Sequence, residues 1–199
     1  MGDVGVSEGM VGVLLAGGGS RRMGRDKALL DWHGRALISH QRGLLSEAGC
    51  ERVVVSRNAP GCTADYFPDS GPLGGIQAVV RDHPAAGYLV IPVDMPLLCP
   101  ATLGSLLRVG MAQGHCHYRR FWLPCFLSGA DAVGLERLLR SRLQRGARSL
   151  SGLLRALDAR PLEGGGEQAQ FINTNTPEDW RVATRHRVFP DAAIQETGS

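Results

Sequence analysis

A glycine-rich segment near the start of the chain, residues 15–27, carries the residue types that bind phosphate groups. Three consecutive glycines, 17–19, can turn successive backbone amides toward one anion. Three cationic side chains follow them in the same segment: Arg21, Arg22 and Lys27. Lys27 is the only lysine among 22 basic residues, which makes its position in this loop informative. Together these features predict a loop that binds a polyphosphate.

Two common glycine-rich motifs do not fit this segment. A P-loop needs Lys followed by Ser or Thr after its second glycine, whereas here Arg25 follows Gly24. A dinucleotide fingerprint needs a third glycine where this chain has Arg22. It also needs an acidic residue near the end of the second strand, where this chain has Ser56-Arg57. The segment therefore belongs to another class of phosphate-binding loop.

Asp94 is the second candidate for chemistry. It directly follows an apolar run at residues 88–93 and lies between Pro92 and Pro96. A carboxylate at the end of a buried strand is costly unless it is paired with a cation, and Mg²⁺ is a natural partner. The alternative is that Asp94 caps the helix expected near Pro100, although a separation of six residues suits a cap poorly.

Two polar residues lie beside expected turns. Asp69 precedes the turn at residues 70–72, and Asn58 follows the strand expected at residues 53–55. From the residues alone, each is about as consistent with an ordinary turn as with ligand binding.

A pair of asparagines lies near the end of the chain. Asn173 and Asn175 alternate along a short strand expected at residues 171–175, so both amides should point to one face. The alternative is that they cap the turn at Thr176-Pro177.

The elements that must position these residues alternate between strand and helix. Apolar runs predict strands at residues 11–16, 53–55, 64–67, 88–93, 159–162 and 171–175. Apolar residues at helical spacing predict helices at residues 35–48, 74–82, 100–111, 131–143 and 149–157, and a last helix begins at Thr176-Pro177. Residues 115–127 favour an antiparallel pair. We therefore expect a three-layer, Rossmann-like α/β fold whose sheet is mostly parallel with a small antiparallel addition.

In an open parallel sheet, ligands bind outside the carboxyl ends of the strands. The loops after residues 16, 55 and 93 should therefore converge, which would bring the glycine-rich segment close to Asp94. We expect a single domain over residues 11–187, with disordered tails at residues 1–10 and 188–199.

Composition excludes several classes of protein. A net charge of +3 is too small and too evenly spread for a nucleic-acid surface, and no apolar run approaches the roughly 18 residues of a membrane span. The amino-terminal residues lack the pattern of a secretory signal, so a cytoplasmic location is expected. Five scattered cysteines disfavour a disulfide framework. A zinc site at residues 115–125 is disfavoured because alternation sends His115 and His117 to one face and Cys116 to the other.

Four motifs in order along residues 11–180 resemble those of the molybdenum cofactor guanylyltransferase family of nucleotidyltransferases. The first is Leu-Ala-Gly-Gly-x-Ser-x-Arg-Met-Gly-x-Asp-Lys, into which Gly19 adds one residue. The others are Pro-Asp-Ser-Gly-Pro-Leu-Gly-Gly-Ile at 68–76, Pro-Val-Asp-Met-Pro at 92–96 and Phe-Ile-Asn-Thr-Asn-Thr-Pro-Glu-Asp at 171–179. The chain departs from the family pattern at residues 119–125.

This resemblance implies a nucleotidyltransferase fold and transfer of GMP from GTP to the terminal phosphate of molybdopterin, with Mg²⁺ as cofactor and pyrophosphate as product. It also implies the roles of the residues. Arg22, Lys27 and Asp94 would be catalytic, with Asp94 as metal ligand. The nucleotide would lie along Leu15, Ala16, Gly17 and Gly18, near Lys27, Asn58, Asp69 and Asp94, and the pterin would face Asn173 and Asn175.

The same resemblance sets the expected partners, which are GTP, molybdopterin and, transiently, proteins that deliver the cofactor. Two alternatives stay open. A cytidylyltransferase on the same fold could act on molybdopterin or on an isoprenoid alcohol phosphate. A catalytically inactive nucleotide-binding partner is the other, against which the presence of both Lys27 and Asp94 argues. Molybdopterin cytidylyltransferases tend to have alanine at the position of Gly17, so this glycine favours a purine.

Overall fold

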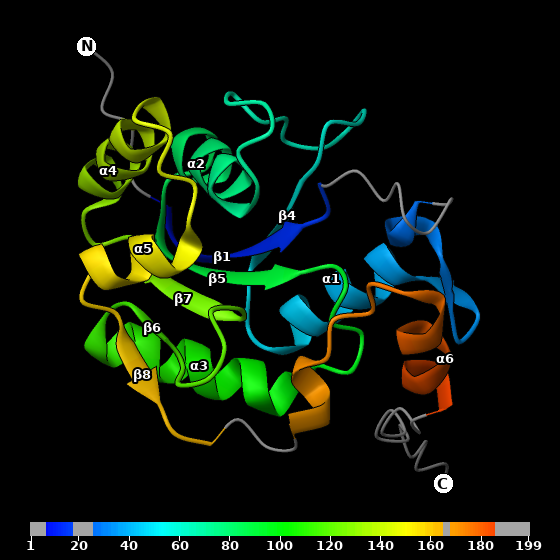
Figure 1. Cartoon of the computed structure of the whole chain (residues 1–199). Coiled ribbons are helices and arrows are strands. Elements are labelled where there is room, and N and C mark those ends of the chain that lie inside the picture. The colour runs from blue at the N-terminus through cyan, green and yellow to red at the C-terminus, as the bar shows by residue number, and fades with distance from the viewer. Residues whose placement is uncertain (1–6, 18–25, 165–167, 186–199) are drawn as a thin grey trace, which may run out of the picture.

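A mixed six-stranded sheet forms the centre of the molecule (Figure 1). The computed structural model describes residues 7–17, 26–164 and 168–185. The strand order is β4-β1-β5-β7-β6-β8. The strands are β1 (Ser7–Leu15), β4 (Arg52–Ser56), β5 (Ala85–Pro92), β6 (Cys116–Tyr118), β7 (Cys125–Ser128) and β8 (Arg160–Leu162). Strand β1 pairs in parallel with β4 and β5, whereas β7 runs antiparallel to both β5 and β6. The antiparallel pair is thus part of the main sheet and joins it through β5.

Helices cover both faces of this sheet, which confirms the three-layer α/β fold expected from the sequence. Figure 1 shows α2 (Pro72–Asp82) and α4 (Ala132–Gln144) above the sheet and α3 (Pro100–Gln113) below it. Leucines of α5 (Leu150–Ala156) join the core of α2 and α4, while α1 (Leu37–Glu47) shares the core of α3. Shorter elements are the 3-10 helices Lys27–Leu29 and Gln168–Phe171 and the two-stranded sheet of β2 (Asp31–Trp32) and β3 (Arg35–Ala36).

The apolar runs form central strands because both of their faces are buried. In β1, Val11 and Val13 enter the core beside α2, and Leu14 enters the core beside α1. In β5, Tyr88 and Leu89 alternate between the same two cores. Burial of each aliphatic side chain contributes about 1.5–3 kcal/mol. The two strands therefore form a fixed platform from which the loops at their carboxyl ends leave.

Strand β1 begins at Ser7, four residues before the expected start at Val11. Met10 is buried, and its carbonyl accepts a hydrogen bond from the Glu51 amide at 3.0 Å. Residues 7–10 therefore belong to the sheet, and their assignment to a tail was wrong. The expected tails at residues 1–6 and 188–199 lie outside the described residues.

Two expected strands are absent from the described residues. Residues 64–67 form none, and their neighbour Thr63 makes only an isolated bridge to Ser56. Residues 171–175 also form none, because the backbone amides there bond elsewhere. The Thr174 amide donates to the Asp94 carbonyl at 2.8 Å, and the Asn175 amide donates to the Asp179 carboxylate at 3.1 Å. The last helix, α6 (Pro177–Arg185), begins where the sequence predicts it.

Candidate active site

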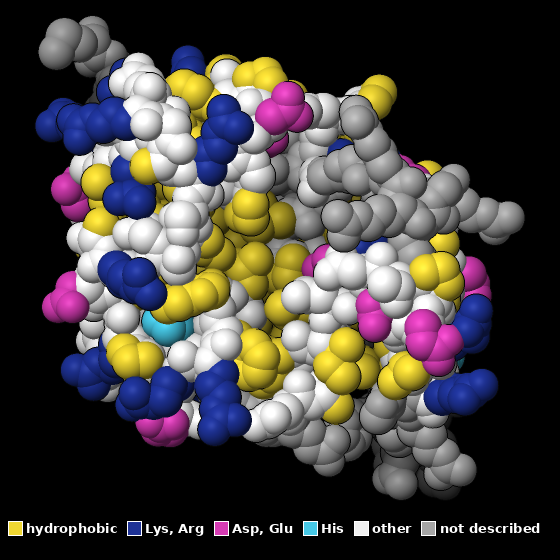
Figure 2. Space-filling view, viewed as in Figure 1, with side chains coloured by type: hydrophobic (Ala, Val, Ile, Leu, Met, Phe, Trp, Pro, Cys, Tyr) yellow, Lys and Arg dark blue, Asp and Glu magenta, His cyan; other side chains and the backbone are white. Residues whose placement is uncertain are grey.

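The loops after β1, β4 and β5 leave the sheet together, as the strand directions require. The Ala16 amide donates to the Ser56 carbonyl at 3.0 Å, and the Val93 amide donates to the Leu15 carbonyl at 2.9 Å. Figure 2 shows a hollow on this side of the molecule, with hydrophobic side chains in its floor. Leu15 is buried at the end of β1, whereas Gly17 is exposed. The carboxyl ends of three strands thus border one opening.

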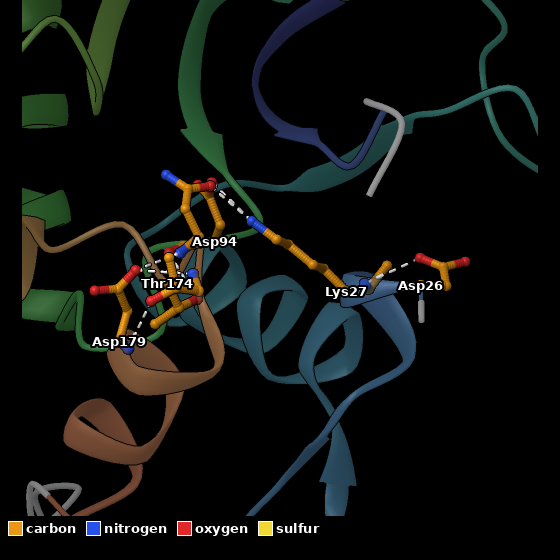
Figure 3. Close-up of polar contacts among 8 residues, drawn as sticks. Asp26, Lys27, Asp94, Thr174 and Asp179 are labelled. Atoms are coloured by element: carbon orange, nitrogen blue, oxygen red, sulfur yellow. Dashed lines mark hydrogen bonds and ion pairs between the residues drawn. The ribbon is translucent and has the colours of Figure 1, made fainter. Parts of the chain in front are cut away.

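Three predicted site residues from distant parts of the chain meet at this opening (Figure 3). The Lys27 ammonium donates a hydrogen bond of 2.6 Å to Asn175 Oδ1. The same nitrogen lies 3.9 Å from Asp94 Oδ2. The Lys27 side chain is only 14% exposed and that of Asp94 only 23%, so solvent screens this ion pair weakly. A partly buried cation and a carboxylate therefore lie side by side where the strands end.

The Lys27 ammonium only partly offsets the cost of burying the charged Asp94 carboxylate. Burial raises the pKa of Asp94 above its ordinary value, and the Lys27 ammonium opposes this effect without cancelling it. A folded environment that raises a carboxyl pKa disfavours the ionised form. A second cation at Asp94 would remove this cost, so the electrostatics suit a site for a divalent metal.

Backbone bonds hold the loop that carries Asp94. The Asp94 carbonyl accepts from both the amide and the hydroxyl of Thr174, at 2.8 and 3.1 Å. The next carbonyl, of Met95, accepts from Gln41 Nε2 at 2.7 Å. The carbonyl of Pro96 is 3.0 Å from His40 Nε2. The sequence predicts the helix at residues 35–48 but not these contacts. The available signal was a pair of adjacent polar residues, His40 and Gln41, among the apolar residues of that helix.

Lys27 is itself positioned by a short helical turn. Asp26 caps the 3-10 helix Lys27–Leu29, since its Oδ1 accepts from the Ala28 amide at 3.1 Å. The other carboxylate oxygen of Asp26 pairs with the guanidinium of Arg57, which directly follows β4. This ion pair ties the end of the glycine-rich segment to the neighbouring strand, and no pattern in the sequence predicts it.

Asn173 and Asn175 do not lie on a strand, so their side chains are not arranged as the expected strand at residues 171–175 would arrange them. The backbone of Asn175 is held by the first turn of α6, where Asp179 also accepts from the Thr176 amide at 2.8 Å. Hydrogen bonds from the Thr176 side chain and backbone lower the pKa of Asp179. The Asn175 side chain points to Lys27. Asn173 is exposed, and its carbonyl accepts from the Asn175 amide at 3.0 Å. The shared face expected for the two asparagines rested on a strand that is not formed.

Asn58 and Asp69 lie in the loop between β4 and α2 and do not join the Lys27–Asp94 pair. Asn58 Oδ1 accepts from the Asp65 amide at 2.9 Å and so braces the loop. Asp69 has a positive φ of 56°, and its carbonyl accepts from Arg148 Nη1 at 3.0 Å. Both residues are exposed. Two of the other predicted residues, Gly18 and Arg22, lie outside the described residues.

The residues considered for a zinc site at 115–125 lie in the antiparallel half of the sheet, where His117 is buried and His115 is half-buried. His115 Nδ1 accepts from the Ser128 amide at 3.1 Å, and Cys116 and Cys125 are buried. Burial raises the pKa of the Cys116 thiol to about 11, so it stays protonated at neutral pH. Within the described part of the chain, no group of three or more His, Cys, Asp and Glu side chains is arranged to hold a metal.

The segment where the chain departs from the family pattern touches the segment that carries Asn175. The rings of Phe121 and Phe171 stack with centroids 4.2 Å apart and an interplanar angle of 8°. Arg155 lies 5.5 Å above the ring of Trp122. The antiparallel half therefore packs against Phe171, at the start of residues 171–175.

Among the described helices, none has the length and apolar character needed to cross a membrane.

Comparisons with known proteins agree with this geometry. Residues 12–160 match the family described as MobA-like NTP transferase domain. The chain is 46% identical to a molybdenum cofactor guanylyltransferase of Xanthomonas euvesicatoria pv. vesicatoria (strain 85-10), over 85% of this chain and 91% of that protein. It is 34% identical to a probable molybdenum cofactor guanylyltransferase of Opitutus terrae, over 89% and 91% of the two chains.

A solved structure shares the fold. It is the molybdopterin-guanine dinucleotide biosynthesis protein A of Archaeoglobus fulgidus, with a TM-score of 0.70, 21% identity and coverage of 87% of this chain and 96% of that one. At this identity the likeness supports the fold, while the family match and the sequence relatives identify the enzyme class. The resemblance drawn from the four motifs is thereby confirmed. The chain belongs to the MobA-like NTP transferase family and is a nucleotidyltransferase.

Proposed function

We propose that this nucleotidyltransferase transfers GMP from GTP to the terminal phosphate of molybdopterin. An oxygen of that phosphate attacks the α-phosphorus of GTP, the bond from the α-phosphorus to the β-bridging oxygen breaks, and pyrophosphate leaves with the bonding electrons. The observation that carries the proposal is the meeting of Lys27, Asp94 and Asn175 at the strand ends. The names of the sequence relatives supply the substrates.

The attacking phosphate is already ionised at neutral pH, so no side chain needs to act as nucleophile or general base. The work left for the protein is to position the two substrates and to neutralise their charge. Lys27 has three N–H donors, of which one reaches Asn175. We assign another to a phosphate oxygen of GTP, with Arg22 as a second phosphate ligand. Together the two cations would hold the leaving pyrophosphate.

Asp94 is the residue that we assign to Mg²⁺. Protein sites for this ion use one or two carboxylates and complete the coordination with substrate phosphates and water. A single carboxylate whose burial raises its pKa fits that requirement. When bound, Mg²⁺ would supply charge neutralisation between the α-phosphate and the pyrophosphate. Asp94 would orient that charge toward the phosphates that Lys27 contacts.

The base is assigned to the side of the opening near Gly17, Asn58 and Asp69. Guanine presents an N1–H, an amine and a carbonyl oxygen, which backbone groups at residues 15–18 can match without a charged side chain. A cavity built for these bonds leaves polar groups unpaired with adenine, at about 1–3 kcal/mol each. GTP should therefore be preferred to ATP by at least about tenfold. The pterin is assigned to the side of Asn173 and Asn175.

The experiment is a nucleotide panel in which pyrophosphate release is measured with molybdenum cofactor as acceptor. GTP should support release, and ATP and CTP should not. Equal turnover of CTP would replace the guanylyl assignment with a cytidylyltransferase. Failure of every nucleotide, with GTP still bound, would favour an inactive binding partner.

We further propose that residues 11–187, together with 7–10 in β1, act as one domain in the cytoplasm and receive the acceptor by transient contact with cofactor-delivering proteins. Cell fractionation tests the location: the enzyme activity should be found in the cytoplasmic fraction.

A further inference from the structure

Three consecutive carbonyls after β5 are each held by a side chain or amide from another element. Thr174 reaches the first, at Asp94, with two donors. Two neighbouring residues of α1 reach the second and third: Gln41 bonds the Met95 carbonyl at 2.7 Å and His40 lies 3.0 Å from the Pro96 carbonyl. We call Thr174, Gln41 and His40 the loop clamp. Since peptide planes are rigid, fixing three carbonyls in a row fixes the backbone of residues 94–96.

Burying the three polar side chains of the loop clamp in the core costs free energy. His40, Gln41 and Thr174 are 2%, 0% and 1% exposed. Within the part of the chain that the structure describes, Gln41 Oε1 has no hydrogen-bond partner. A buried polar oxygen without a partner costs free energy that an apolar side chain of the same size would avoid. Stability alone therefore does not explain an amide at this position of α1.

The positions of the clamp contacts suggest a functional reason for these polar side chains. Each of the three clamp residues bonds the backbone at or directly after Asp94, and none of these bonds ends on the Asp94 carboxylate, which faces Lys27. The other ring nitrogen of His40, Nδ1, accepts from Arg35 Nη2 at 2.8 Å, which leaves Nε2 to donate to the Pro96 carbonyl. With its backbone fixed, the Asp94 side chain keeps only two rotatable bonds, so the direction of the carboxylate is narrowly set. In other metal sites, loss of the hydrogen bonds that orient a metal ligand lowers metal affinity or activity by roughly 10- to 100-fold.

We propose that Thr174, Gln41 and His40 are positioning residues that hold residues 94–96 so that the Asp94 carboxylate is directed at the metal-bound triphosphate. This inference rests on the proposed role of Asp94 as metal ligand. It assigns a part in nucleotide binding to α1, a helix outside the four sequence motifs.

The test compares GTP binding with Mg²⁺ and GTP binding with EDTA, measured by calorimetry on the full chain. The ratio of the two dissociation constants is the metal-dependent gain in affinity. Gln41→Met keeps volume and flexibility but removes the bond to Met95. His40→Leu removes the contact to Pro96 together with the bond to Arg35, which lies outside the loop. Each should reduce the gain by about tenfold while leaving the affinity in EDTA unchanged.

Thr174 offers a matched pair of variants. Thr174→Val keeps the shape and the amide but loses the hydroxyl, so the gain should fall by about threefold. Thr174→Ser keeps the hydroxyl and should retain the wild-type gain. Rescue by serine distinguishes hydrogen bonding to Asp94 from packing.

Tyr88→Phe is the control for a purely structural effect. The Tyr88 hydroxyl also donates to a backbone carbonyl, of His83 at 3.2 Å, but at the opposite end of β5, and the residue is fully buried. Its loss should lower the melting temperature and leave the metal-dependent gain unchanged.

Three results would overturn the proposal. One is a wild-type gain in Gln41→Met and His40→Leu while Asp94→Asn loses it, which leaves the role of Asp94 intact and removes that of the clamp. Another is an equal reduction in Tyr88→Phe. The third is a wild-type gain in Asp94→Asn, which removes the metal role of Asp94 and the clamp with it. If wild-type protein binds no GTP under either condition, the proposed nucleotide is wrong, and repeating the comparison with CTP decides the clamp.

Discussion

Two loops at the same edge of the sheet each present an aspartate, and they hold it differently. The loop after β5 fixes Asp94 through its backbone, by bonds from α1 and from residues 171–175, and leaves the side chain 23% exposed. The loop between β4 and α2 holds Asp69 in a turn of positive φ, with one bond from Arg148 to its carbonyl. The Asp69 side chain is exposed.

The difference separates two tasks. A carboxylate that acts at close range on a dense charge must be desolvated and aimed, because its interaction weakens quickly with distance and with solvent. An exposed carboxylate in a turn is screened and contributes little by charge alone. Removing the charge of Asp94 should therefore matter far more than removing that of Asp69, and the following variants test this ordering.

Asp94→Asn should have the largest effect. The substitution keeps the size of the side chain and removes the charge that balances the metal, so pyrophosphate release should fall by about 10²-fold or more. Because burial raises the pKa of Asp94, the folded state disfavours its ionised form, and the neutral amide should unfold at no lower temperature than wild type in the absence of metal. Thermal melting and steady-state rates measure the two effects. Wild-type rates would end the metal assignment.

Lys27→Ala should be next. It removes an ammonium whose charge-assisted bonds to phosphate are worth about 1.5–3 kcal/mol, or roughly 10- to 150-fold in GTP affinity or rate. Lys27→Met keeps the aliphatic stem and should lose as much, because the loss comes from the charge. Binding and initial-rate measurements at fixed Mg²⁺ give the comparison. Unchanged kinetics in either variant would refute the phosphate role.

Gly17→Ala should have a selective effect. A methyl group at Gly17 would lie 3.8 Å from the Ser56 carbonyl, an ordinary contact, so the fold should accept it. If guanine lies against this glycine, use of GTP should fall by about tenfold relative to CTP. Gly43→Ala, in the interior of α1, is the control, since its methyl group would be 3.8 Å from the nearest atom. It should stabilise the protein by roughly 0.5–1 kcal/mol and leave the GTP to CTP ratio unchanged.

Asp69→Asn should have the smallest effect. Asparagine tolerates positive φ, so the turn should persist while the charge is lost. An exposed charge of this kind changes the KM for GTP by about two- to fivefold. Asp158→Asn makes the same change at another exposed aspartate of positive φ, between α5 and β8, and should leave the KM unchanged. A loss at Asp69 as large as that at Asp94 would contradict the division of tasks.

The sequence predicts the parts of this molecule that local patterns control. The apolar runs at residues 11–16 and 88–93 led to β1 and β5, and strand direction alone placed the glycine-rich segment near Asp94. The pattern failed at residues 171–175, which alternate like a strand but bond to Asp94 and Asp179. Those bonds join residues far apart in the chain, and no local spacing encodes them.

The site shows the same division. Lys27, Asp94 and Asn175 were identified by motif, and the structure brings them together. The contacts that support them were missed. His40 has the spacing of a core position in an amphipathic helix, Gln41 does not stand out beside it, and the Arg57–Asp26 pair spans two loops. The spacing of apolar residues in the sequence predicts a helix. The hydrogen-bond partner of one buried side chain depends on which element packs against that helix in the folded protein.

The position of Thr174 also orders events during synthesis. The last strand of the sheet, β8, ends at Leu162, whereas Thr174 lies 80 residues after the Asp94 carbonyl that it holds. Domains fold from the amino terminus as they emerge from the ribosome. A nascent chain can therefore complete its sheet and the core beside α2 before its loop clamp is made, whereas the core beside α1 also needs Phe171 and Ala183. The enzyme would bury one of its two cores first and become able to use nucleotide only after residues 171–175 have emerged, which separates the formation of that core from activity in time.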